Sequence, residues 1–131
     1  MTAGQGRLRS PLGRAVGLGS AKEGVEHWWR QRLTAIALVP LALWFAASVL
    51  AHLGSDHAQF VAWLRSPVPA ILMILVVGTS FYHAALGCQV VIEDYVHGEG
   101  AKLVSLILLR LVCLLFAVAG IFAVLRIALG S

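Results

Sequence analysis

One histidine in this 131-residue sequence lies deep inside a long apolar segment, which makes it a candidate for chemistry. Gly87, Val90 and Asp94 follow His83 at spacings of four, three and four residues, which places all four on one face of a helix. An ionisable side chain at such a depth needs a partner and usually faces protein or a cavity. Two interpretations stay open. The imidazole is neutral and bonded to a neighbouring helix, or it binds a haem iron or another metal, with Gly87 leaving room for the porphyrin edge.

Asp94 and Tyr95 lie where this apolar segment ends. Acidic residues and a tyrosine are common at a membrane surface, so a simple interfacial role is one interpretation. In the other, the Tyr95 hydroxyl donates a hydrogen bond to a carbonyl-bearing ligand, while Asp94 orients that ligand or passes protons.

Basic and aromatic side chains precede the first apolar segment, and most of them are typical interfacial anchors. Arg32 differs because it directly adjoins the apolar residues. A guanidinium at this position could bind carboxylates, such as the propionates of a haem.

These residues are carried by three apolar segments, at about residues 33–52, 68–92 and 103–125. Each has roughly the 20 residues that a helix needs to cross the hydrocarbon core of a bilayer. The period-2 alternation of barrel strands is absent, and backbone groups in lipid must be satisfied within the segment. The sequence therefore predicts an all-α integral membrane protein with three transmembrane helices. Ser66 and Pro67 mark the start of the second helix.

Composition and charge agree with a membrane location. Hydrophobic residues make up 60% of the chain and charged residues 12%, which excludes an ordinary soluble domain. The basic residues are concentrated in a tail rather than along a folded face, so no nucleic-acid binding is expected. We expect residues 1–24 to form a flexible basic tail and residues 25–131 to form the three-helix anchor.

The distribution of Lys and Arg predicts the orientation. Seven of these residues flank one side of the predicted spans, six before the first span and Lys102, whereas only Arg65 and Arg126 flank the other side. The positive-inside rule then places the N-terminus in the cytoplasm and the C-terminus outside.

Two stretches of the chain resemble a known family, the D-type hydrophobic membrane anchors of succinate dehydrogenase (succinate:quinone oxidoreductase, respiratory complex II). Residues 83–96, HAALGCQVVIEDYV, match the H-x3-G-x6-DY pattern of that family, and residues 27–35, HWWRQRLTA, are similar to its entry into the first helix. The sister anchor of the same complex, the C-type anchor, has a Ser-x3-Arg motif ahead of its first helix. That motif is missing here because Trp28 precedes Arg32 by four residues.

The resemblance implies specific roles. His83 would be one axial ligand of a haem b shared with the sister C-type anchor, and Arg32 would reach the haem propionates. Tyr95 would hydrogen-bond a carbonyl of ubiquinone, with Asp94 beside it. The further partners implied are an iron–sulfur subunit and a flavoprotein subunit, in the inner membrane of a bacterium.

The chain itself has no dinucleotide fingerprint and no cysteine spacing for a cluster, so succinate oxidation would belong to those soluble subunits. We therefore expect no activity from the chain alone. Two alternatives remain at this point: a cytochrome b-type anchor of a fumarate reductase, and a three-span structural membrane protein without a cofactor.

Overall fold

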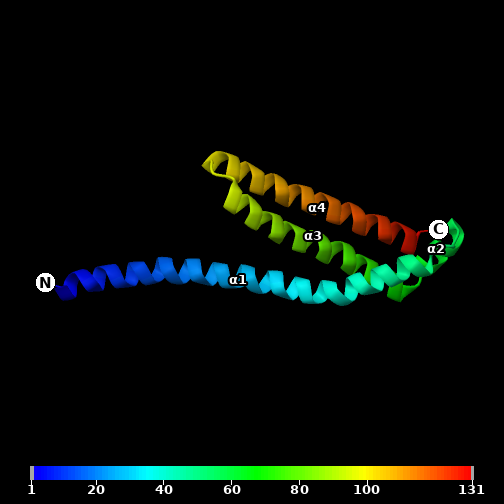
Figure 1. The fold of residues 1–131 in the computed structure, drawn as a ribbon, viewed down its shortest axis with the longest axis horizontal. Helices are drawn as coiled ribbons and strands as arrows, with labels where there is room; N and C mark the ends of the chain where they lie inside the picture. Colours follow the sequence, from blue (N-terminus) through cyan, green and yellow to red (C-terminus); the bar gives the residue numbers. More distant parts are fainter. Residues whose placement is uncertain (1, 131) are drawn as a thin grey trace. The chain divides into compact units, whose positions relative to one another are not determined.

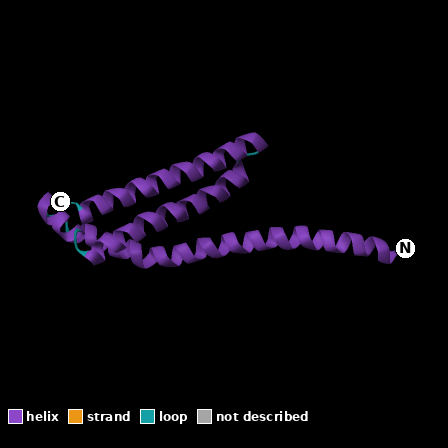
Figure 2. Ribbon diagram, turned by 180° about the vertical axis from the view of Figure 1, so that it is seen from behind, coloured by secondary structure: helices purple, strands orange, loops and turns teal. Residues whose placement is uncertain are grey.

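The computed structural model is all-helical over the residues that it describes, which are 2–130 for the backbone and 24–130 for the side chains. The helices are α1 (Thr2–Ala51), α2 (His57–Leu64), α3 (Pro67–Tyr95) and α4 (Glu99–Leu129). Figures 1 and 2 show these helices joined by short loops, and no strand occurs between residues 2 and 130. The predicted all-α fold is confirmed.

Three helical stretches are long and apolar enough to cross a membrane: Gly24–Ala51, Pro67–Tyr95 and Glu99–Leu129. The three predicted spans are therefore confirmed, although each helix extends beyond the predicted segment. The reason is that backbone hydrogen bonding continues past the last apolar side chain into residues that suit the membrane surface. The sidedness of the termini stays a prediction.

The chain divides into two compact units, Met1–Arg32 and Leu33–Ser131. In the first unit, the backbone is helical from Thr2 onward. The side chains of residues 1–23 lie outside the described part of the chain, and the flexibility predicted for the tail stays a prediction.

In the second unit, α3 and α4 lie side by side and antiparallel (Figures 1 and 2). They pack closely at Gly120 of α4, where an added Cβ would lie 2.8 Å from Cγ1 of Val77. One turn away, the rings of Phe81 and Phe116 stack with centroids 6.1 Å apart. Small residues allow such close packing between helices in a membrane.

The connection between α1 and α3 contains a short helix, α2, which lies outside the three helices predicted from the sequence. The Asp56 side chain accepts a hydrogen bond from the Gln59 backbone N–H at 2.8 Å, and the Gln59 side chain accepts one from the Asp56 N–H at 3.0 Å. This reciprocal capping box starts the helix. The expected start of α3 is confirmed, since Ser66 is its N-cap and Pro67 opens its first turn.

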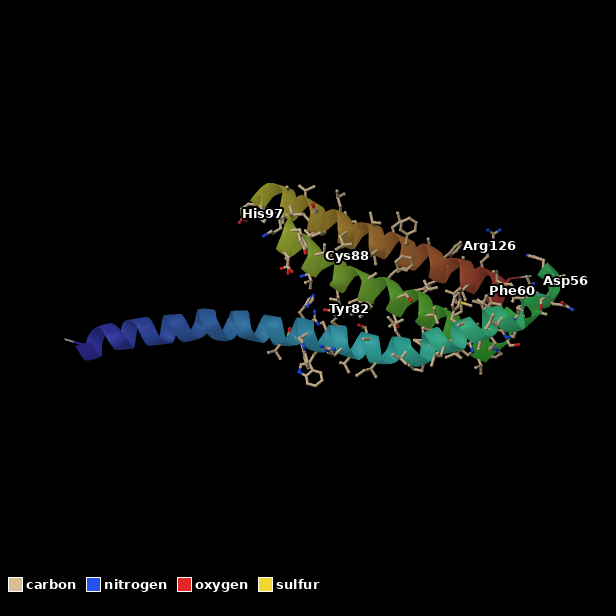
Figure 3. All side chains as sticks on the ribbon, viewed as in Figure 1. Asp56, Phe60, Tyr82, Cys88, His97 and Arg126 are labelled. Carbon is tan, nitrogen blue, oxygen red and sulfur yellow. The ribbon has the colours of Figure 1, made fainter. Side chains whose placement is uncertain are left out.

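Aromatic contacts attach α2 to the end of α1. The ring of Trp63 stacks on Trp44 with centroids 6.0 Å apart and lies 4.3 Å from the ring of His52. The next residue, Leu64, is the most buried side chain of the core at 2% exposure. These contacts hold α2 beside the C-terminal end of α1. Figure 3 labels Asp56 and Phe60 in this part of the chain.

Candidate cofactor-binding site

His83 of α3 makes a side-chain contact with α1. Its Nδ1 atom lies 2.8 Å from Oγ1 of Thr34, within hydrogen-bonding distance, and both side chains are part-buried. Both residues belong to the unit Leu33–Ser131. The contact therefore joins two membrane-spanning segments through their polar side chains.

The two residues lie at matching depths in their helices. Thr34 comes ten residues after the start of the Gly24–Ala51 span, and His83 comes twelve residues before the end of α3 at Tyr95. At 1.5 Å per residue, these offsets are about 15 Å and about 18 Å along the axes. His83 is therefore well inside the apolar region, as the sequence predicts.

The engagement of Nδ1 decides which atom of His83 is available to a ligand. A neutral imidazole has two distinct nitrogens, and the one that is hydrogen-bonded fixes the role of the other. With Nδ1 bonded to Thr34, Nε2 is the nitrogen left for a metal. One turn further on α3, Gly87 lies on the same face and carries no side chain.

The residues around His83 could supply a single ligand to a cofactor rather than a full set of ligands to a bare ion. Within residues 24–130, no three His, Cys, Asp or Glu side chains gather to hold a bare metal ion. A haem iron already has four porphyrin nitrogens and needs only axial ligands from protein. A single histidine with Nε2 available meets that requirement for one face.

Asp94 and Tyr95 are placed at the end of α3, away from His83. Both are exposed, Tyr95 at 76%. Eleven or twelve residues of helix, roughly 17 Å, separate them from His83, so the structure does not bring the three side chains into one pocket. Beside them, Nε2 of Gln89 donates a hydrogen bond to Oε1 of Glu93 at 2.9 Å. Asp94 and Tyr95 thus form a polar helix end that is open to a partner.

Arg32 lies in the first unit, where its guanidinium carbon is 5.3 Å from the centroid of the Trp28 ring. This is a cation–π distance, and it accounts for the position of the side chain on its own helix. In the same segment, Nε2 of His27 is buried without a hydrogen-bond partner among the described residues. His27 is one of the basic and aromatic side chains that precede the first apolar segment, and its orphaned nitrogen marks it as a further candidate for contact with a ligand or partner.

Thr34 is the residue that the sequence analysis missed. It is the only hydroxyl side chain between residues 33 and 47, and this isolation in an apolar segment was the available signal. A hydroxyl can bond its own helix backbone as well as another side chain, so the pattern alone did not identify His83 as its partner.

Comparison with known proteins identifies the family. The family model described as succinate dehydrogenase/fumarate reductase transmembrane subunit matches residues 6–119. No solved structure shows significant similarity to the chain.

Curated relatives give the same result. The chain is 42% identical over 117 residues to the succinate dehydrogenase hydrophobic membrane anchor subunit of Rickettsia bellii, covering 89% of this chain and 94% of the relative. It is 31% identical over 125 residues to the subunit of the same name from Paracoccus denitrificans, covering 95% and 96%. The succinate dehydrogenase membrane anchor subunit of Reclinomonas americana is 34% identical over 96 residues, covering 71% and 80%. The chain therefore belongs to the family of succinate dehydrogenase/fumarate reductase transmembrane subunits, as a multi-pass membrane anchor of the succinate dehydrogenase type.

Proposed function

We propose that this anchor subunit provides His83 as one axial ligand of a haem b and contributes Tyr95 and Asp94 to a ubiquinone-reduction site. The observation that carries the first part is the hydrogen bond between Nδ1 of His83 and Oγ1 of Thr34. It holds the imidazole by one nitrogen and leaves Nε2 available, at a depth where an ionisable side chain usually faces protein or a cavity.

The residues of this chain would hold the haem in two ways. His83 would bind the iron through Nε2, and Arg32 would form charge-assisted hydrogen bonds to the propionates. When bound, the haem supplies a one-electron redox centre within the bilayer. A second histidine would come from the sister C-type anchor, because His83 is the one histidine of this chain deep inside an apolar segment, whereas His52 lies at the end of one.

The end of α3 suits the protonation steps of quinone reduction. Reduction of ubiquinone to the quinol takes up two electrons and two protons. Tyr95 donates a hydrogen bond to a quinone carbonyl, and Asp94 relays protons from water. Their exposure at a helix end supports this assignment, since a proton path needs access to the aqueous phase.

The electrons come from soluble partners. The iron–sulfur subunit and the flavoprotein subunit bind on the cytoplasmic side of the inner membrane, at the end of α3 that carries Tyr95. The curated relatives are named for succinate dehydrogenase, which favours succinate oxidation over fumarate reduction as the direction. Succinate:ubiquinone oxidoreductase is therefore the assembly to which we assign the chain.

The test of haem ligation is His83→Ala in the complete membrane complex. Removal of the imidazole takes away one iron ligand, so the reduced-minus-oxidised spectrum should lose or alter its low-spin b-type signal. The complex is purified by a tag on a soluble subunit, so that its assembly is measured independently of the haem.

His57→Ala is the matched control, because His57 is exposed at the start of α2, at the opposite end of α3 from Tyr95. This variant should keep the parent spectrum. An unchanged low-spin spectrum in His83→Ala would show that His83 is not the ligand.

A further inference from the structure

We propose that Thr34 is a positioning residue for His83. Its hydroxyl oxygen accepts a hydrogen bond from Nδ1–H and thereby fixes both the tautomer and the ring orientation of the imidazole. This inference rests on the proposed haem ligation by His83 and adds to it a residue on a different helix. The juxtaposition that supports it is the 2.8 Å separation of Thr34 Oγ1 and His83 Nδ1.

The hydroxyl group suits either tautomer of a free imidazole, because it both donates and accepts hydrogen bonds. Coordination of Nε2 to iron would leave only one tautomer of the neutral imidazole. Once Nε2 coordinates a metal, the proton of a neutral imidazole must reside on Nδ1, and Nδ1–H can only donate. Thr34 Oγ1 is then the acceptor, which is the role that backbone carbonyls and carboxylates play for metal-bound histidines elsewhere.

Thr34 is a well-defined acceptor for geometric reasons. Its side chain is branched at Cβ and has few χ1 rotamers available in a helix. By contrast, the terminal torsion of a histidine ring is broad, so the hydrogen bond restricts an angle that the rotamer alone leaves loose. Because Thr34 belongs to α1 and His83 to α3, the packing of two helices sets the plane of the ring.

The hydrogen bond from His83 to Thr34 would also affect the electron density at an iron bound through Nε2. An imidazole that donates from Nδ1 is a stronger ligand through Nε2. A stronger donor favours the ferric state over the ferrous state, so loss of the acceptor should raise the midpoint potential of the haem. In the apolar interior, water does not readily replace the missing oxygen, which keeps the effect measurable.

The experiment compares Thr34→Val with Thr34→Ser in the complete complex. Valine keeps the branched shape without the hydroxyl, and serine keeps the hydroxyl without the methyl group. Two measurements report on the histidine rather than on turnover: the largest g-value of the low-spin ferric haem in EPR, which depends on the angle between the axial imidazole planes, and the haem midpoint potential. We expect Thr34→Val to shift the g-value and raise the potential, and Thr34→Ser to stay close to the parent in both.

Ser48→Ala is the matched control on the same helix. It removes a hydroxyl fourteen residues away, about 21 Å along α1, and should change neither measurement. Should Thr34→Val fail to assemble, Thr34→Ala removes the same hydroxyl without new bulk and is judged by the same two measurements.

The outcomes separate this inference from the proposed function. If the hydroxyl-free variant retains the parent g-value and potential, or if serine fails to restore them, Thr34 does not position the ligand. Haem ligation would still stand as long as His83→Ala loses the low-spin signal. If His83→Ala keeps that signal, the proposed function itself is wrong.

Discussion

Tyr95 is the residue whose proposed role depends most on other subunits, because its side chain is 76% exposed in this chain. A hydrogen bond from its hydroxyl to a quinone carbonyl would strengthen as negative charge develops on that oxygen during reduction. Tyr95→Phe removes only the hydroxyl and should lower succinate:ubiquinone reductase activity by the equivalent of about 1–3 kcal/mol, the cost of leaving a buried carbonyl without its hydrogen-bond donor. Activity is measured with a ubiquinone analogue in purified complex.

Two comparisons make that result specific. Succinate oxidation with an artificial acceptor that takes electrons before the quinone should stay near normal, because the flavin and clusters are untouched. Tyr82→Phe changes another tyrosine of α3, 46% exposed and thirteen residues away, and should leave quinone reduction unchanged (Figure 3). Equal loss in both assays would indicate an assembly defect, and no loss would return Tyr95 to an interfacial role.

Residues of the candidate site differ in how far sequence alone could identify them. His83 stands out because an imidazole is rare among apolar side chains, and the structure confirms that it has a polar partner. Thr34 does not stand out, since a hydroxyl is tolerated in any membrane helix. Its importance depends on which side chain of α3 lies opposite, and that is decided by helix packing rather than by local sequence.

At the scale of the helices, the contact between α3 and α4 depends on Gly120. A Cβ at this position would lie 2.8 Å from Cγ1 of Val77, closer than carbon atoms pack. Val77 is stiff at χ1, so the helices rather than the side chain must move. Gly120→Ala should therefore lower the free energy of unfolding by about 1–3 kcal/mol, measured by thermal or denaturant unfolding of the purified complex in detergent.

Gly100→Ala is the matched control, because no atom lies within 4 Å of the Cβ that it adds near the start of α4. Alanine also has the higher helix propensity, so this variant should be neutral or slightly stabilising. The double variant Val77→Ala/Gly120→Ala should recover most of the lost stability. A Gly120→Ala complex as stable as the parent would show that the two helices do not pack closely at this position.

The sequence predicted some helices of this chain more accurately than others. The three spans follow from apolar length, which is a strong signal. The predicted segments were shorter than the observed helices. Hydropathy detects the apolar centre of a helix and not the polar turns that continue the same hydrogen-bonded backbone. The short helix α2 was missed even though Asp56 and Gln59 have capping-box spacing, since eight residues give too few turns for a clear period.

Considered as a whole, the described part of the chain has almost no interior. Four of its apolar side chains are buried: Leu64, Ala70, Leu86 and Val124. Large apolar side chains are exposed along all three spans. Lipid covers such surfaces as well as protein does, so the exposed apolar area is compatible with a membrane protein. The polar atoms are different, because the orphaned Nε2 of His27 requires a hydrogen-bond partner that lipid does not provide.

These features lead to the prediction that the chain does not function alone. His83 can bind only one face of a porphyrin, and the end of α3 offers polar groups without an electron donor. We expect the tagged chain, extracted in mild detergent, to co-purify with a second multi-span subunit and two soluble subunits, and to carry haem only in that assembly.

Mass spectrometry of the purified material identifies the subunits, and the pyridine haemochrome spectrum quantifies the haem. Expression without the second multi-span subunit should yield haem-free chain, because under the proposal that subunit would provide the second histidine. Recovery of a stable, haem-loaded monomer would contradict the shared site, since the ligand opposite His83 would then have to come from within this chain.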